Sequence, residues 1–280
     1  FMEDYAKPFA MLVIADLLGV PLEDHAAFRS ALGNEAVGEV GGEDTVAHNP
    51  LVWLDDKFRE YISDRRREPR ADVLTELAEA TYPGGGVPEV EEVVKLATFL
   101  FAAGMETTTK LLSTGMRVMG ERPDIQQALR RDRGQIPSFL EEALRMESPV
   151  KSHFRLASTT TEIGGVSIPA GTILMLLPGA SNRDPRKFDD PHEFKHDRRN
   201  VREHVAFGRG PHSCPGAPLA RSEARISFNR MLDRMADIHL DESVHGPPHN
   251  RSYVYDPTFI MRGLSSLRVT FTPVSVAGAS

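Results

Sequence analysis

The chain has 280 residues, of which 40% are hydrophobic and 26% charged, and its formal net charge is −7. This length and composition fit one large globular unit or two tightly packed lobes, and they exclude a predominantly disordered chain. The negative charge argues against a nucleic-acid-binding protein, and no basic segment is interleaved with aromatic residues. We therefore expect small molecules and proteins as partners.

The apolar segments are too short to cross a membrane. The segment 9–15 ends at Asp16 and has neither a basic leader nor a cleavage site. A second apolar segment, 96–105, falls well short of the roughly twenty residues that a membrane-spanning helix needs. We expect no membrane association and a cytoplasmic location, and the use of a single cysteine agrees with that compartment.

Apolar periodicity predicts several helices in the first part of the chain. The pattern predicts helices over 5–18, over 22–32, from Leu51 through Tyr61, and over an unusually long stretch, 88–120. A glycine-rich and acidic segment, 34–50, predicts a loop, and the run 65–67 of three arginines predicts a solvated helix end. The long helix is almost wholly apolar over 96–105, so we expect it in the centre of the protein.

The second part mixes helices with short strands. Two helices are predicted over 123–131 and 138–146, and β-branched segments separated by glycines at 164–165 and by the turn 169–171 predict hairpins. A polar segment, 182–205, predicts a long wrapped loop, and a helix over 219–235 and a strand over 267–272 follow. The fold class is therefore mainly α with a minor β part, in a single domain over 1–280.

Cys214 is the only cysteine of the chain. A single sulfur cannot form an internal disulfide, a four-cysteine zinc site or an iron–sulfur cluster, so any metal role must use one thiolate. Its neighbours Gly208, Gly210 and Gly216 let the backbone turn toward the sulfur, and a helix starting after Gly216 places its positive N-terminal dipole there. The alternative is a buried, inert cysteine in an ordinary loop.

The segment around this cysteine resembles the haem-binding loop of the cytochrome P450 family. The family pattern Phe-Gly-x-Gly-x-His/Arg-x-Cys-x-Gly matches at every fixed position of 207–216. The resemblance implies haem b as the cofactor and Cys214 as the axial thiolate. It also implies that Phe207 packs beside the sulfur, that Gly208 and Gly216 shape the cradle, and that His212 reaches a haem propionate.

A second motif lies inside the long predicted helix. Gly104 followed by consecutive threonines is a poor choice for helix stability, although such residues also serve packing in buried helices. The segment 103–108 resembles the family's acid–alcohol motif. The resemblance implies that Thr107 hydrogen-bonds dioxygen, that Glu106 relays protons, and that Gly104, next to the haem-lining Ala103, opens a groove in the helix.

Two further segments match the family pattern. Glu142 and Arg145 have the spacing of its Glu-x-x-Arg helix, and the resemblance implies a buried structural triad with Arg198 of the wrapped loop. Arg155 corresponds to an arginine that binds the other propionate. The substrate pocket implied by the resemblance is lined by Phe99, Ala102, Val150, His153 and Phe259. Lys151 and His153 suggest a substrate that carries a hydrogen-bond acceptor.

The matching motifs follow one another in the family's order, but nothing in the chain matches the family's first strands and helices. The resemblance therefore implies a cytochrome P450 fold that lacks its N-terminal portion, and a monooxygenase that inserts one oxygen atom of O₂ into a small apolar organic substrate. Two alternatives are a haem enzyme driven by peroxide, and a truncated, non-catalytic fragment with weak or no haem binding.

The electrons must come from another protein, because the chain has neither a flavin fingerprint nor an iron–sulfur cysteine cluster. A ferredoxin or flavodoxin fed by an NAD(P)H reductase is the implied partner. The stretch 195–225 carries more basic than acidic residues, which suits an acidic ferredoxin. We also expect a truncated chain to self-associate, with Tyr5 and Phe9 packing against a second copy.

Overall fold

The computed structural model describes residues 1–32 and 50–274. The chain divides into two compact units, Phe1–Thr109 and Lys110–Ser280, and the boundary lies within the long helix α5 (Val90–Glu121). The loop expected over 34–50 lies outside the described residues, apart from Pro50, which begins helix α3.

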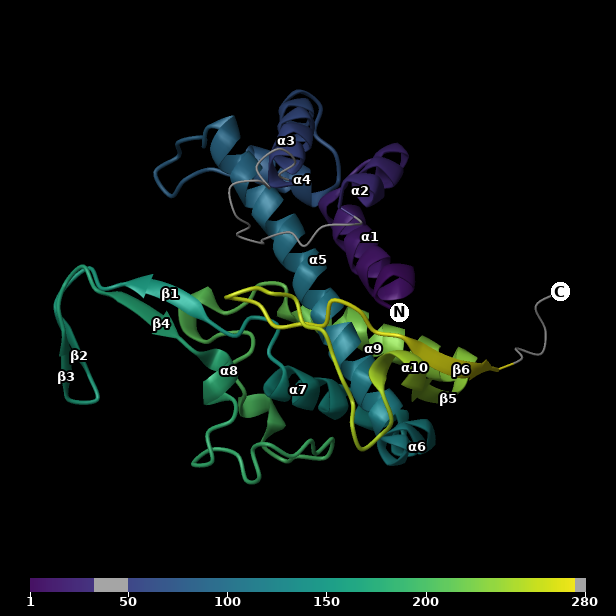
Figure 1. Cartoon of the computed structure of the whole chain (residues 1–280). Helices are drawn as coiled ribbons and strands as arrows, with labels where there is room; N and C mark the ends of the chain where they lie inside the picture. Colours follow the sequence, from purple (N-terminus) through teal and green to yellow (C-terminus); the bar gives the residue numbers. More distant parts are fainter. Residues whose placement is uncertain (33–49, 275–280) are drawn as a thin grey trace. The chain divides into compact units, whose positions relative to one another are not determined.

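The first unit is helical (Figure 1), and its helices pack around an aromatic core. Phe28, Phe58 and Phe101 are fully buried, and their rings contact one another. Gly19 ends α1 in the left-handed conformation, with φ of 94°, which glycine adopts without strain. The elements are η1 (Met2–Ala6), α1 (Lys7–Leu18), η2 (Leu22–Asp24), α2 (His25–Leu32), α3 (Pro50–Arg67), α4 (Val73–Glu79) and the first part of α5.

The prediction of a solvated end at 65–67 was wrong for Arg65. The Arg65 side chain is only 2% exposed. Its guanidinium donates to the Asp72 carboxylate at 2.7 and 2.9 Å and to the carbonyl oxygen of Gly19 at 2.8 Å. Asp72 also caps α4, a short helix absent from the sequence prediction, by accepting from the backbone N–H of Thr75. The charge run therefore contains one buried residue that joins the ends of three helices.

As far as residue 274, the second unit combines helices with three small antiparallel sheets. Gly164 and Gly165, both with positive φ, form the turn of the β2–β3 hairpin, as the sequence predicts. Strand β4 pairs with β1, and the β2–β3 hairpin lies between them in the sequence. The hairpin therefore extends beyond the β1–β4 ribbon (Figure 1). The elements after α5 are α6 (Pro123–Arg131), η4 (Arg133–Gln135), α7 (Ile136–Met146), β1 (His153–Leu156), β2 (Thr161–Ile163), β3 (Val166–Ile168), β4 (Ile173–Leu176), α8 (Pro178–Ser181), η5 (Val201–Glu203), η6 (Gly210–His212), α9 (Ala217–Arg234), β5 (Met235–Leu240), α10 (Glu242–His245) and β6 (Val269–Pro273).

The fold class predicted from the sequence, mainly α with a minor β part, is confirmed. The segment 182–205 is irregular apart from one turn of 3₁₀ helix, as expected for a wrapped loop. Strand β5 was absent from the prediction, and it pairs with β6. In the described part of the chain, every helix is too short or too polar to cross a membrane.

Candidate functional site

The cysteine loop presents its sulfur at the surface of the second unit. Cys214 is exposed, and its backbone N–H donates to the carbonyl oxygen of Phe207 at 2.8 Å, which closes the loop. Gly208 and Gly210 have φ of 71° and 79°, values that side chains disfavour. Gly216 caps the N-terminus of α9 with an ordinary φ of −79°, so its backbone does not require glycine.

A cluster of two buried residues, Glu141 of helix α7 and His204, with the exposed Arg221 supports this loop. The Glu141 side chain accepts hydrogen bonds from Arg221 Nε at 2.5 Å and Nη2 at 3.0 Å, and its Oε2 lies 2.8 Å from His204 Nε2. Burial raises the pKa of this carboxyl, but the hydrogen bonds to His204 and Arg221 outweigh that effect and lower it to about 2. Glu141 is therefore an ionised group beneath the cysteine loop.

The same cluster contacts the start of the loop. The Arg221 guanidinium lies 4.6 Å from the centre of the Phe207 ring, and the Ala206 backbone N–H donates to His204 Nδ1 at 3.1 Å. The hydrogen bond to Glu141, together with the charge of that carboxylate, raises the pKa of Arg221. Sequence reasoning missed this cluster, because its three members are far apart in the chain. The sequence signal that could have indicated it is Glu141, a second acidic residue directly before Glu142.

The structure brings Glu142, Arg145 and Arg198 together, at the positions that the Glu-x-x-Arg resemblance implies. Arg145 donates to both Glu142 oxygens, at 2.7 and 2.8 Å, and Arg198 Nε lies 3.1 Å from each of them. Glu142 and Arg145 are fully buried, and the Arg198 side chain is nearly so. The backbone N–H of Lys195 also donates to Glu142, at 3.0 Å.

The two arginines of this triad organise the wrapped loop by binding its carbonyl groups. Arg145 Nη1 donates to Asn182 at 2.8 Å and to Pro191 at 2.9 Å. Arg198 Nη1 donates to Asp189 at 2.5 Å. A loop without regular hydrogen bonding must satisfy its backbone groups elsewhere, and here the buried guanidinium groups do so.

Strand β1 carries the second predicted propionate ligand and part of the predicted pocket. Arg155 is exposed and donates to the carbonyl oxygen of Phe154 at 2.8 Å. Burial, together with the nearby charge of Arg155, lowers the pKa of His153, which favours its neutral form. Phe154 stacks on Phe259, with ring centres 6.3 Å apart, and both rings are exposed. Val150 forms an isolated β-bridge with Met261.

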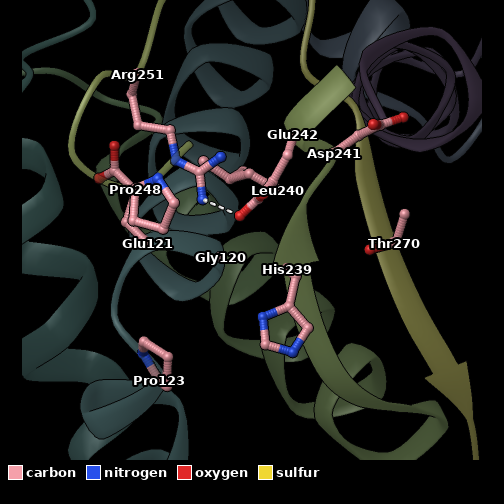
Figure 2. Close-up of a pocket in the computed structure, with 10 residues that line it drawn as sticks. All are labelled: Gly120, Glu121, Pro123, His239, Leu240, Asp241, Glu242, Pro248, Arg251 and Thr270. Carbon is pink, nitrogen blue, oxygen red and sulfur yellow. Dashed lines mark ion pairs between the residues drawn. The ribbon is translucent and has the colours of Figure 1, made fainter. Parts of the chain in front are cut away.

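Two cavities of the second unit differ in their relation to these residues. The first, of about 520 Å³, lies at the end of α5 and contains none of the predicted site residues. Figure 2 shows its lining, in which Arg251 pairs with Glu242 at 3.9 Å. The second, of about 500 Å³, is lined in part by Lys151, Ser152 and Phe259, so it adjoins the predicted pocket wall.

The acid–alcohol segment belongs to the first unit. Thr107 Oγ1 donates to the carbonyl oxygen of Ala103 at 2.7 Å, one turn earlier. A methyl group on Gly104 would lie 3.0 Å from the end of the Ile14 side chain, so the glycine allows close packing of α1 on α5. Gly104 therefore serves packing within this unit, and its expected groove-opening role stays a prediction. Glu106, Ala102 and Phe99 are at least partly exposed on the same helix, with Phe99 at 65%.

The residues of the second unit fit a haem. Cys214 offers an exposed sulfur, and Arg155 and His212 are exposed cationic or hydrogen-bonding groups suited to carboxylates. The described residues contain no group of three or more His, Cys, Asp or Glu that could hold a metal ion. Large apolar side chains that would be costly to leave in water are also exposed here: Phe154, Leu156, Ile173, Leu176 and Phe259.

Comparisons with known proteins agree on one family. The model of the family described as Cytochrome P450 matches residues 52–250. The substrate-free structure of cytochrome P450 CYP150A6 from Mycobacterium marinum is 61% identical, with a TM-score of 0.89 over 98% of this chain and 64% of that one. The structure of CYP109E1 from Bacillus megaterium with corticosterone is 31% identical, with a TM-score of 0.83 over 96% of this chain and 71% of that one.

Cytochrome P450 monooxygenase PikC from Streptomyces venezuelae is 35% identical over 279 residues, which are 99% of this chain and 64% of that protein. The chain therefore spans less than two thirds of the length of this curated relative.

Proposed function

Because the chain belongs to the cytochrome P450 family, we propose that the whole protein is a haem-thiolate monooxygenase. It inserts one oxygen atom of O₂ into an apolar organic substrate and releases the other as water. The observation that carries this proposal is the exposed Cys214 sulfur in a closed loop at the start of α9, supported from below by the Glu141 cluster. The family match of the motifs around it supports the same conclusion.

The cofactor in this proposal is haem b, held by residues of this chain. Cys214 would bind the iron, Arg155 and His212 the propionates, and Phe207 would pack beside the sulfur, with Gly208 and Gly216 in the cradle and Ala103 against the ring. A bound haem supplies the redox-active iron at which dioxygen is reduced. The helix dipole of α9 stabilises negative charge on the sulfur, because the sulfur lies before its first turn.

The proton path is assigned to α5. Thr107 holds a proton on Oγ1, which in this structure is directed to the carbonyl oxygen of Ala103. Glu106, partly exposed one residue earlier, exchanges protons with water and passes them inward. The pair therefore delivers protons to the site of oxygen reduction. A reaction that reduces O₂ with electrons from a partner protein needs this delivery, whereas a peroxide-driven reaction needs it less.

The substrate in this proposal meets an apolar wall at Phe154 and Phe259, with Phe99, Ala102 and Val150 as further lining residues. The Lys151 ammonium donates to the carbonyl oxygen of Thr258 at 2.9 Å, so it serves the protein backbone rather than a substrate acceptor. His153 remains the polar group of this wall. The relative from Bacillus megaterium was crystallised with corticosterone, and a rigid, apolar molecule of this kind is a suitable first probe.

The partners in this proposal are a ferredoxin or flavodoxin and its NAD(P)H reductase, in the cytoplasm. A single cysteine cannot bind an iron–sulfur cluster of its own, so the electrons must be delivered from outside. Self-association of the 280-residue chain through its exposed apolar residues stays a prediction.

The experiment supplies the whole protein with a ferredoxin, its reductase, NADPH and ¹⁸O₂, with corticosterone as the first probe and the ligands found by a spectral binding screen after it. The proposal predicts a product that carries one ¹⁸O atom and depends on the reductase. Product formation only with added hydrogen peroxide would contradict it in favour of a peroxide-driven enzyme. A protein that binds no haem would instead favour a non-catalytic chain.

A further inference from the structure

Helix α5 contains a buried lysine that neither the sequence motifs nor the proposed mechanism uses. Lys110 is 3% exposed, and its Nζ lies 2.6 Å from the Asp256 carboxylate, whose side chain is 16% exposed. Lysine is rarely buried unless it is paired, because removing its charge from water is costly. The pair joins residues that are 146 positions apart in the chain.

The neighbouring Gly263 makes room for this lysine. A methyl group on Gly263 would lie 2.4 Å from Lys110 Cγ and 2.7 Å from its Cδ, distances that are sterically forbidden. The backbone of Gly263 is not among the glycines with positive φ. The backbone conformation therefore does not require glycine at position 263. The glycine is required because the Lys110 stem leaves no room for a side chain there.

Asp256 stands at the base of a closed loop. Its backbone N–H donates to the carbonyl oxygen of Gly263 at 3.0 Å, and the adjacent residues Tyr255 and Leu264 form an antiparallel bridge. Inside the loop, the Thr258 backbone N–H donates to the carbonyl oxygen of Asp256 at 2.8 Å. The ion pair with Lys110 thus holds the loop at its base, where its two ends are hydrogen-bonded to each other.

The tip of this loop forms the apolar wall of the proposed pocket. Phe259 and Ile260 are 69% and 41% exposed, and the Phe259 ring stacks on that of Phe154. The backbone N–H of Lys151 donates to the carbonyl oxygen of Ile260 at 2.8 Å, which joins the tip to the segment before β1. Phe259 also lines the cavity of about 500 Å³ described above. The position of the 256–263 loop therefore determines where the apolar surface of Phe259 and Ile260 lies.

We propose that Lys110 and Asp256, with Gly263 packed against the lysine stem, form an anchor that positions the 256–263 loop and so determines which apolar substrates fit. Lys110 is a positioning residue, since it acts through Phe259. This inference rests on the proposed function for its substrate, but the anchoring itself is a property of this chain alone.

The test uses two variants of the whole protein that disturb the anchor differently. Lys110→Met removes the charge and leaves Asp256 unpaired, and Gly263→Ala retains both charges but displaces the lysine stem. The matched controls are Arg133→Met, which removes a more exposed ion pair to Asp233 at 3.3 Å, and Gly84→Ala, where an added methyl group meets nothing within 4 Å. If Lys110→Met does not fold, Gly263→Ala still tests the proposal.

The first measurement is hydrogen exchange of the backbone amides over 255–264 and 150–152, which needs no haem. We expect faster exchange in both anchor variants and wild-type exchange in both controls. The second is the ratio of the dissociation constants of 4-phenylimidazole and imidazole, read from the haem spectrum, because the two probes differ only by an apolar ring. We expect the preference for 4-phenylimidazole to fall by about threefold or more in the anchor variants.

Unchanged exchange in the anchor variants, or equal changes in the controls, would overturn the anchor. Faster exchange with an unchanged preference would overturn its role in specificity. A wild-type protein without a thiolate-ligated haem spectrum would overturn the proposed function and the specificity role with it, whereas the exchange measurement would still decide the anchor.

Discussion

Thr107 is the residue on which the proposed proton path depends most directly. Thr107→Ala removes the hydroxyl but no charge, and the hydroxyl bond to Ala103 lies within one helix, so the fold should survive. We expect retained haem binding and a fall of severalfold in product formed per NAD(P)H consumed, because protons are no longer delivered in a controlled manner. Thr109→Ala is the matched control, because Thr109 makes the same type of bond, to Met105 at 2.9 Å. An unchanged ratio in Thr107→Ala would refute the role.

Glu141 makes stability depend on pH. Its pKa in the folded protein, about 2, lies below the usual 4.5, so its contribution is fully present above about pH 4.5 and is lost as the pH falls toward 2. A pKa difference of this size contributes on the order of 3 kcal/mol to the free energy of unfolding. We expect Glu141→Gln to be less stable at neutral pH and to lose less stability on acidification.

Urea unfolding at several pH values between about 5 and 2 measures this effect. Glu162→Gln, at an exposed carboxylate of strand β2, is the control and should retain the wild-type pH dependence. An identical pH dependence in Glu141→Gln and the wild type would show that the cluster around Arg221 does not hold the carboxylate in its ionised form.

At the scale of elements, the buried triad fixes the wrapped loop. Removing one partner of a buried, hydrogen-bonded charge group typically costs about 3–5 kcal/mol. We therefore expect Arg198→Met to lower the free energy of unfolding by that order and to expose the segment 182–205 to proteolysis. Arg186→Met is the control in the same loop, because Arg186 is 88% exposed and pairs with Asp184 at the surface. Equal stability losses in the two variants would contradict the account.

Local sequence signals predicted the elements that need little tertiary information. Helix α6 matches its predicted bounds, and the β2–β3 turn follows from its two glycines, which tolerate positive φ. Helix α4 and strand β5 were missed, because short elements carry little periodicity. The burial of Arg65 could not be predicted, since its partners come from separate helices and an arginine run usually lies in solvent.

The site shows the same division. The loop around Cys214 and the triad with Glu142 were predicted from short motifs, because a motif carries its spacing with it. The Glu141 cluster and the pair of Lys110 with Asp256 were missed, because their members come from distant parts of the sequence. Such pairs become visible only when the fold brings them within hydrogen-bonding distance.

At the scale of the whole molecule, we expect a redox partner to dock on the basic surface near the cysteine loop. Arg202 and Arg209 are exposed there, whereas Arg198, of the same basic stretch, is buried in the triad and cannot contribute. Reversing Arg202 and Arg209 to Glu should slow electron transfer from an acidic ferredoxin by tenfold or so at low salt, and the difference should shrink as salt rises. Rates measured by stopped flow should be unaffected by Arg67→Glu, which reverses a charge in the first unit at a side chain that is 79% exposed. Equal rates in all variants would remove this surface as the docking site.

The ligation of haem by Cys214 tests the central claim most directly. The measurement is the absorption spectrum of the whole protein after reduction and exposure to carbon monoxide, for the wild type and for Cys214→His. We predict the strongly red-shifted Soret band of thiolate ligation in the wild type and its loss in the variant. A freshly prepared, folded wild-type protein that instead gives the spectrum of histidine ligation would contradict the account.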